Sequence, residues 1–352
     1  MPFQSFSGVG LRGLAAAVPS NIIDNYQYTD HFPVDEVKAV VDKIGVYQRR
    51  FANASTCASD LCAAAAEKLF ADLDTDRSQI DLLIFVSKTP DYRMPATSIV
   101  LQERLGLSSR TMAFDINLAC SGFINGLAVV YALMQQATFR KALLLTGETR
   151  SKVYSPKDRG TAFLFGDGGT AAIIEKNPDY GQSFFSMNSD GSREGLIKAK
   201  AGGYRNPSTS DTFKEEIIDE HGNKRSQEHG YMNGPDVFNF VLREIPKDIS
   251  NLLEFSQARL ECLDYYLFHQ ANSFMNSYLM KKMKLPQEKV PTSISKFGNT
   301  SSVSIPLTMV SELKGRLDTR KAVLLSGFGA GMSWASAIIN LVDCHLSEIV
   351  EI

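Results

Sequence analysis

Three residues of this 352-residue chain have the types and settings for nucleophilic thiol chemistry. Cys120 stands at a corner in "FDINLACSGFINGLAVVYALM", between a strand-like stretch and a long apolar run. His269 ends the apolar run of "DYYLFHQAN", and Asn299 lies in the Gly- and Ser-rich "KFGNTSSVSIP". A thiolate is the nucleophilic form of cysteine, and the partial positive charge of a helix N-terminus stabilises it. We predict such a helix over residues 121–136, directly behind Cys120.

Each of these residues also has an ordinary structural interpretation. A lone cysteine is most often a small buried hydrophobe, and a histidine after an apolar run is often a hydrogen-bonded core residue. An asparagine after glycine is a common turn residue. No chemistry therefore follows from these residues taken singly, and it has to be inferred from the strands and helices that position them.

Self-similar segments recur along the chain at a spacing of about 180 residues. "DLLIFVSKT" recurs as "DYYLFHQAN", and "KALLLTGE" recurs as "KAVLLSGFGAG". The corner that holds Asn299 follows the corner that holds Cys120 at a similar distance. This constant order and spacing indicate an internal duplication. The first half, residues 1–180, carries the cysteine, and the second half, residues 181–352, carries the histidine and the asparagine.

Both halves are expected to contain buried strands covered by helices. The runs "LLIFV", "ALLLT", "YYLF" and "AVLLS" are apolar without strict alternation, which is typical of central strands covered on both faces. Ligands of open α/β sheets bind where strands end and helices begin, so the duplication places Cys120, His269 and Asn299 at equivalent sheet ends. A loop-rich segment over about 190–233 is either a substrate-side flap or a solvated connector.

The composition is typical of a soluble globular protein, with 44% hydrophobic and 22% charged residues. A formal net charge of −2 gives no electrostatic reason to expect nucleic acid as a partner. No apolar run of about 18 residues predicts a membrane span, and "MPFQSFSGVG" lacks the pattern of a signal peptide. The five cysteines form no CxxC pair, which disfavours a zinc ribbon and favours a reducing cytoplasm.

Five segments together resemble the signatures of β-ketoacyl-ACP synthase III, a condensing enzyme of the thiolase superfamily. They are "DINLACSGF", "DRGTAFLFGDGGTAAII", "FHQAN", "FGNTSSVSIP" and "SGFGAGMSWAS". The similarity runs from about Gly8 to Leu341. The resemblance implies an α/β, thiolase-like five-layered αβαβα fold made of two duplicated halves, and a homodimer. Such a fold agrees with the repeat found in the sequence.

The resemblance also implies a role for each candidate residue. Cys120 would take an acyl group from acyl-CoA or acyl-ACP, while backbone N–H groups of Cys120 and Ala330 hold the oxyanion. Malonyl-ACP would then decarboxylate, with His269 and Asn299 stabilising the enolate by hydrogen bonds. We expect a neutral His269, because a buried corner disfavours the charged form. The CoA or phosphopantetheine thioesters are substrates in this scheme, and no metal or redox cofactor is implied.

Several expected substrate-binding positions depart from the family pattern. Phe274 replaces an arginine that helps to dock the carrier protein, two residues after "HQAN". Ala39 and Lys43 replace a tryptophan and an arginine of the CoA clamp, whereas Arg159, in "DRGT", matches the family residue. Because half of this clamp is missing, the acyl donor could arrive on a carrier protein instead of on CoA.

Two more positions are expected at the acyl group. Met94, in "YRMPATS", holds the position that usually closes the acyl pocket, where a flexible methionine would admit a longer or branched chain. Simple interface packing is the other interpretation of Met94. Phe328, in "SGFGAG", is also expected to contact the substrate.

Two other functions remain open at this point. Some relatives with this fold transfer the acyl group from the cysteine to an alcohol or amine, and the three retained residues do not exclude that reaction. The histidine and asparagine favour condensation, because enolate stabilisation is what this pair provides. A non-catalytic relative that only binds a partner is disfavoured, since drift is expected to erase one of the three residues.

Overall fold

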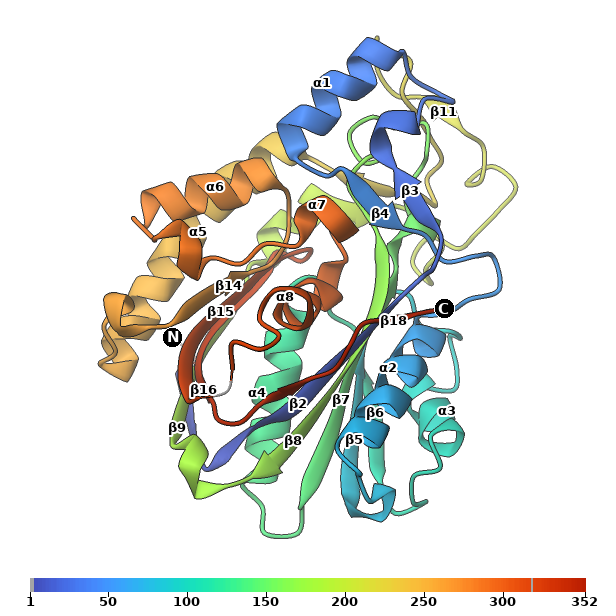
Figure 1. The fold of residues 1–352 in the computed structure, drawn as a ribbon. Coiled ribbons are helices and arrows are strands. Elements are labelled where there is room, and N and C mark those ends of the chain that lie inside the picture. Colours follow the sequence, from blue (N-terminus) through green and yellow to red (C-terminus); the bar gives the residue numbers. More distant parts are fainter. Residues whose placement is uncertain (1–2, 318) are drawn as a thin grey trace.

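The structure, a computed structural model, describes residues 3–317 and 319–352, and two large β-sheets form the centre of this part of the chain (Figure 1). The larger sheet has the order β17-β2-β8-β7-β5-β6, and β18 also pairs with β2. Its strands are β2 (Val9–Val18), β5 (Ile80–Val86), β6 (Met112–Ile116), β7 (Lys141–Thr149), β8 (Asp167–Lys176), β17 (His345–Leu346) and β18 (Val350–Glu351). The smaller sheet has the order β1-β9-β16-β15-β14. Its strands are β1 (Phe3–Ser7), β9 (Gln182–Ser189), β14 (Tyr265–Phe268), β15 (Lys321–Gly329) and β16 (Ser333–Leu341).

The two sheets repeat one topology, which confirms the duplication inferred from the sequence. The run β2-β8-β7-β5 has two antiparallel junctions and then a parallel one, and the run β9-β16-β15-β14 has the same three junctions. Equivalent helices lie in the connections between equivalent strands of the two sheets. These pairs are α2 (Ala58–Asp72) with α5 (Gly234–Ser256), α3 (Thr97–Arg104) with α6 (Ser273–Lys282), and α4 (Gly122–Met134) with α8 (Ser304–Glu312).

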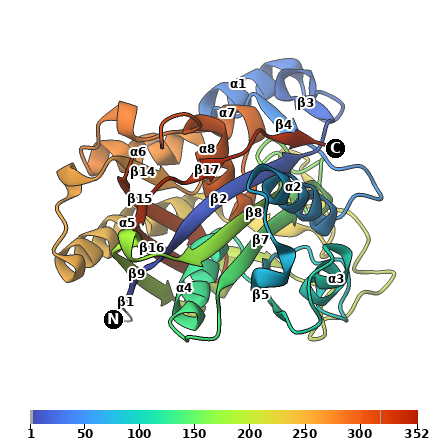
Figure 2. The same ribbon diagram turned by 60° about the horizontal axis from the view of Figure 1, so that its bottom comes forward.

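The helices and sheets stack in five layers (Figures 1 and 2). Helices α4 and α8 lie between the sheets, where Leu127 and Leu307 share one buried core with Leu144 of β7 and Leu325 of β15. Helices α2 and α3 cover the outer face of the larger sheet, and α5 and α6 cover the outer face of the smaller sheet. The central strands are apolar without alternation because both of their faces are covered. This is the thiolase-like αβαβα arrangement.

Strands at the two ends of the chain cross between the halves. Strand β1 pairs with β9 in the smaller sheet, and β17 and β18 pair with β2 in the larger sheet. One strand of residues 1–180, β1, thus joins the smaller sheet, and two strands of residues 181–352, β17 and β18, join the larger one. This exchange ties the halves together through main-chain hydrogen bonds as well as through the shared core.

The loop-rich segment over about 190–233 contains short elements. Strand β10 (Ile197–Ala199) pairs with β13 (Gly230–Met232), and β11 (Glu216–Ile217) pairs with β12 (Lys224–Arg225). The remaining elements near this end of the molecule are α1 (Val34–Ile44), β3 (Ile22–Asp24), β4 (Gln48–Arg50) and α7 (Ile294–Phe297).

Candidate active site

Cys120 lies in the corner between β6 and α4, one residue before the helix N-cap Ser121. The predicted helix is present, and it is two residues shorter at its C-terminal end than expected. Strand β15 of the other half passes directly over this corner. A Cβ atom on Gly327 would lie 2.7 Å from the Cys120 carbonyl oxygen, and one on Gly329 would lie 2.7 Å from Cys120 Sγ. Both positions therefore require glycine, which explains the first two glycines of "SGFGAG".

A narrow cavity of about 70 Å³ brings the three predicted residues together. Cys120, His269 and Asn299 all line it, and so do Phe328 and Ala330. The ring of Phe328 packs edge-on against the His269 ring, with centroids 5.5 Å apart. Residues from both halves thus form one site at the carboxyl ends of parallel strands, as the strand–helix corners predicted.

His269 is buried and held by a hydrogen bond. Its Nδ1 lies 2.7 Å from Ser304 Oγ at the start of α8. Ser304 Oγ also accepts the Gln270 N–H at 3.3 Å and has its own proton to donate to Nδ1, which suits the tautomer with the proton on Nε2. Burial lowers the pKa of His269 to about 3, and the Arg150 guanidinium adds to this shift. The ring is therefore a neutral hydrogen-bond donor at physiological pH, as expected.

The side-chain amide of Asn299 is oriented by the backbone of its own loop. Its Oδ1 accepts the Ser301 N–H at 2.9 Å, and its backbone N–H donates to the Leu164 carbonyl at 2.8 Å. Nδ2 makes only a long contact of 3.5 Å with the Ala271 carbonyl. The amide oxygen is thus occupied, and the NH₂ group is the one available to a ligand.

The other polar residues of "HQAN", Gln270 and Asn272, stabilise the corner by hydrogen bonds. Gln270 Oε1 accepts from Thr292 Oγ1 at 2.9 Å, and Asn272 caps α6 by accepting the Met275 N–H at 2.8 Å. These hydrogen bonds fix the Gln270 side chain and the amide oxygen of Asn272, whose NH₂ group makes no hydrogen bond to the described residues where Asn272 lines both this cavity and the one outside it.

The helix N-terminus behind Cys120 led us to expect a stabilised thiolate, but the burial of this residue acts in the opposite direction. Burial raises the pKa of the Cys120 thiol, although the Arg150 guanidinium and a 3.7 Å contact with Ser301 Oγ oppose that rise. Desolvation is the largest contribution to this shift and exceeds the opposing effects of Arg150 and Ser301. The resting residue is a thiol, and its proton has to leave during the reaction.

Two N–H groups beside Cys120 fit an oxyanion hole. The backbone N–H groups of Cys120 and Ala330 donate to no described residue, and Ala330 lines the cavity next to the close approach of Gly329. Unpaired N–H donors that converge on a nucleophile stabilise the negative oxygen of a tetrahedral intermediate.

Comparison with known proteins agrees with this geometry. Residues 114–191 match the family "3-Oxoacyl-[acyl-carrier-protein (ACP)] synthase III", and residues 253–341 match its C-terminal part. The chain is 35% identical over 351 residues to a putative 3-oxoacyl-[acyl-carrier-protein] synthase 3 of Campylobacter jejuni, covering 98% of this chain and 97% of that protein. It is 34% identical to the β-ketoacyl-[acyl-carrier-protein] synthase III of Streptococcus agalactiae, covering 93% and 98%. The crystal structure of a 3-oxoacyl-(acyl-carrier protein) synthase from Burkholderia xenovorans superposes with a TM-score of 0.93 at 39% identity, covering 99% of both chains.

The chain belongs to the β-ketoacyl-ACP synthase III family. It is a condensing enzyme of the acyltransferase class.

The mouth of this synthase's active site holds three of the predicted substrate-binding residues. Lys43, Arg159 and Phe274 line an outer cavity of about 350 Å³, which shares Leu164 and Met232 with the Cys120 cavity. The outer cavity therefore adjoins the inner one, as a passage for a long thioester arm requires. Met232 comes from the loop-rich segment, which supports the flap interpretation of that segment.

Arg159, which matches the family pattern, and Phe274, which departs from it, both have defined neighbours at this mouth. The Arg159 guanidinium pairs with Glu36 of α1, so the matching residue is partly engaged by the protein itself. The Phe274 ring stacks on Phe238 with centroids 5.3 Å apart, and half of Phe274 remains exposed. An apolar surface thus stands where the family pattern has a cation.

Met94 lies away from both cavities in the described chain. Its side chain is 78% exposed and lines neither the inner nor the outer cavity. Within a single chain it does not close the acyl pocket.

Sequence inspection missed two charged residues beside the cysteine. Glu148, at the end of β7, is fully buried, and Arg150 follows it and lines the Cys120 cavity. The signal was "LLLTGETR", in which charges follow a buried strand at the sheet end that carries the chemistry.

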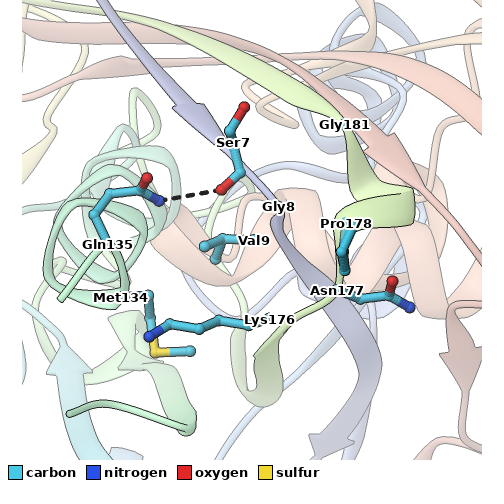
Figure 3. A pocket seen from close by; sticks show the side chains of 9 residues that line it. All are labelled: Ser7, Gly8, Val9, Met134, Gln135, Lys176, Asn177, Pro178 and Gly181. Carbon is cyan, nitrogen blue, oxygen red and sulfur yellow. Dashed lines mark hydrogen bonds between the residues drawn. The ribbon is translucent and has the colours of Figure 1, made fainter. Parts of the chain in front are cut away.

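A larger hollow lies elsewhere on the surface of the described chain. A surface hollow of about 470 Å³ lies at the opposite strand ends, around Val9 and Lys176, and Gln135 Nε2 donates to the Ser7 carbonyl there at 3.3 Å (Figure 3). It shares no lining residue with the Cys120 cavity. Across residues 3–317 and 319–352, no group of side chains is arranged to hold a metal ion, and no helix is long and apolar enough to cross a membrane.

Proposed function

We propose that this synthase loads an acyl group on Cys120 and condenses it with a malonyl thioester. The observation that carries the proposal is the single buried cavity lined by Cys120, His269 and Asn299. Acyl transfer needs only the cysteine and an oxyanion hole, whereas condensation also needs two neutral donors for an enolate. His269 and Asn299 have the protonation state and the orientation for that task.

In the first half-reaction, Cys120 Sγ attacks the carbonyl carbon of an acyl thioester. The carbonyl electron pair moves to oxygen, where the N–H groups of Cys120 and Ala330 stabilise it. Collapse of the intermediate breaks the bond to the leaving sulfur. The thiol proton of Cys120 goes to that sulfur, so the products are the acyl-enzyme and free CoA or carrier thiol.

In the second half-reaction, the malonyl thioester binds with its carbonyl oxygen between the two donors. The bond to its carboxylate breaks, CO₂ leaves, and the electron pair forms an enolate. Nε2–H of His269 and the NH₂ group of Asn299 hydrogen-bond the enolate oxygen. The enolate carbon then attacks the acyl carbon and expels the Cys120 thiolate, which gives a β-ketoacyl thioester.

We further propose that the thioesters are delivered by CoA or acyl carrier protein through the outer cavity. The cations Lys43 and Arg159 suit the phosphates of CoA or phosphopantetheine, and the exposed ring of Phe274 suits an apolar contact on the carrier. No resident cofactor or metal takes part in this scheme, and the enzyme acts in the cytoplasm.

A homodimer is the proposed working form. Strand β6 is the last strand of the larger sheet and leaves an edge for pairing, and Met112 on β6 is exposed, as is Met94 nearby in the sequence. In such a dimer Met94 would be buried at the interface or against the partner's acyl cavity.

Intact-mass spectrometry with an acyl carrier protein assay tests the function. Wild-type protein mixed with short acyl thioesters is expected to gain one acyl mass on Cys120, and malonyl-ACP should then release it as β-ketoacyl-ACP. The Cys120→Ala variant should gain no acyl mass, and Asn299→Ala should be acylated but slow to condense. Release of the acyl group by an alcohol or amine, without malonyl-ACP, would contradict the proposal.

A further inference from the structure

A buried arginine, Arg150, lines the cavity that holds Cys120. It follows β7 directly, at the start of a short 3-10 helix (Arg150–Lys152), and only 7% of its surface is exposed. A charge at this depth is costly unless its N–H groups and its charge have partners, because water no longer solvates it. A plain hydrocarbon chain in this cavity would gain no interaction from the buried guanidinium group.

The protein leaves this guanidinium incompletely satisfied. Nη2 donates to Tyr154 Oη at 2.7 Å, but Nη1 lies 3.9 Å from Glu148 Oε2, beyond hydrogen-bond distance. Nε is buried without a hydrogen-bond partner among the described residues. The guanidinium carbon lies 5.1 Å from the ring centroid of Tyr154 and 5.5 Å from that of Phe165. The two rings hold the cation in place, and part of its N–H edge remains for a ligand.

Glu148 is not free to complete the pair. Its carboxylate accepts hydrogen bonds from the hydroxyl groups of Ser301 at 3.1 Å, Ser302 at 3.3 Å and Thr89 at 3.3 Å. These bonds anchor Glu148 in the loop beside the nucleophile and keep it at ion-pair distance from Arg150. Glu148 thus balances the charge of Arg150 in part, without using its N–H groups.

The charge around the inner end of the cavity is positive. A further cavity of about 150 Å³ shares Arg150, Tyr154 and three other lining residues with the Cys120 cavity, and Lys88 and Lys198 also line it. Lys198 pairs with an exposed glutamate at 2.5 Å. Arg150 and Lys88 therefore both line this adjoining cavity, and none of its lining residues is acidic.

We propose that the acyl group loaded on Cys120 is short and ends in a carboxylate, which Arg150 binds at the inner end of the cavity. The inference rests on the condensing function proposed above and names the class of its acyl donor. A terminal carboxylate supplies both the missing hydrogen-bond acceptors and the missing negative charge. A terminal methyl group supplies neither and leaves Nε of Arg150 without a partner.

Donors of matched length test the proposal on the wild-type protein. Succinyl and butyryl groups have the same number of carbons and differ in a carboxylate against a methyl group, and 3-hydroxybutyryl is a neutral polar comparison. Each is offered as a CoA thioester and as an acyl carrier protein thioester, and initial acylation of Cys120 is followed by intact mass. We expect succinyl to be preferred over butyryl by at least about tenfold in kcat/KM, which corresponds to about 1.4 kcal/mol.

Variants of Arg150 separate binding from a merely structural role. Arg150→Leu should lower the succinyl-to-butyryl ratio of kcat/KM at least about tenfold, because KM for succinyl rises more than the acylation by butyryl changes. Arg150→Lys keeps the charge and should retain part of the preference for succinyl. A structural role would lower both rates equally and reduce the thermal midpoint without changing their ratio.

The outcomes distinguish this inference from the proposed function. Preference for butyryl or 3-hydroxybutyryl over succinyl in the wild-type protein would overturn the carboxylate assignment and leave the condensing function intact. An unchanged succinyl-to-butyryl ratio in Arg150→Leu would also overturn it. Failure of every thioester to acylate Cys120 would instead overturn the proposed function.

Discussion

Replacing Gly329 with alanine is expected to slow the acylation of Cys120 by on the order of 10²-fold. The new Cβ atom would lie 2.7 Å from Cys120 Sγ and 2.8 Å from Cys120 Cβ, whereas ordinary contacts begin at 3.4 Å. Strand β15 and the start of α4 are both packed in the core, so no side chain can simply swing away. To relieve the clash they have to move apart by about 0.7 Å. Ala330 moves with β15, so the oxyanion donor and the nucleophile separate. A misplacement of about 1 Å in an active site costs about 10²-fold in rate.

Rapid-quench intact-mass measurement of acyl loading, with thermal unfolding in parallel, is the assay for this variant. The extra methyl group should also destabilise the fold by about 1–3 kcal/mol through overpacking. Gly195→Ala is the matched control, since a Cβ atom there meets nothing within 4 Å, and it should behave as wild type. Wild-type loading and stability in Gly329→Ala would refute the claim that β15 touches the nucleophile.

Three further predictions concern protonation and orientation in the site. Ser304→Ala removes the Nδ1 partner of His269, worth about 1 kcal/mol, so condensation should slow about fivefold while mass spectrometry shows unchanged loading of Cys120. Because burial lowers the pKa of His269 from 6.5 to about 3, the unfolded chain binds more protons in this range, and stability should fall as pH drops from about 6.5 towards 3. His269→Gln should flatten that slope in denaturant titrations, and an unchanged slope would contradict it. Because burial raises the pKa of the Cys120 thiol, its alkylation by iodoacetamide should still accelerate above pH 9, and a plateau below pH 8 would disagree.

The fold was predictable from local patterns because the central strands are buried on both faces. Continuous apolar runs such as "ALLLT" and "AVLLS" can satisfy their side chains only between two helical layers, and their recurrence at a fixed spacing exposed the duplication. The exchange of β1, β17 and β18 between the sheets was not predictable. Short edge strands carry little pattern of their own, and their pairing depends on which edges the rest of the fold leaves open.

The site was predictable in its residue types but not in its electrostatics. Cys120, His269 and Asn299 were found because strand–helix corners at equivalent positions of a repeat meet at one sheet end. The rise in the pKa of the Cys120 thiol was not predicted, because the sequence shows the helix N-terminus but not the depth of burial that raises this pKa. Met94 was assigned to the acyl pocket by its position in a motif, yet its surroundings in the single chain are solvent.

The sequence by itself determined the repeat, the buried strands and the three candidate residues that prove to line one cavity. The tertiary structure decided which other residues share their cavity, Arg150 among them, and that burial lowers the pKa of His269 and raises that of Cys120. The reason is physical. Local patterns report what each segment needs to bury, whereas protonation and specificity depend on how much water and which charges the distant segments leave around a side chain.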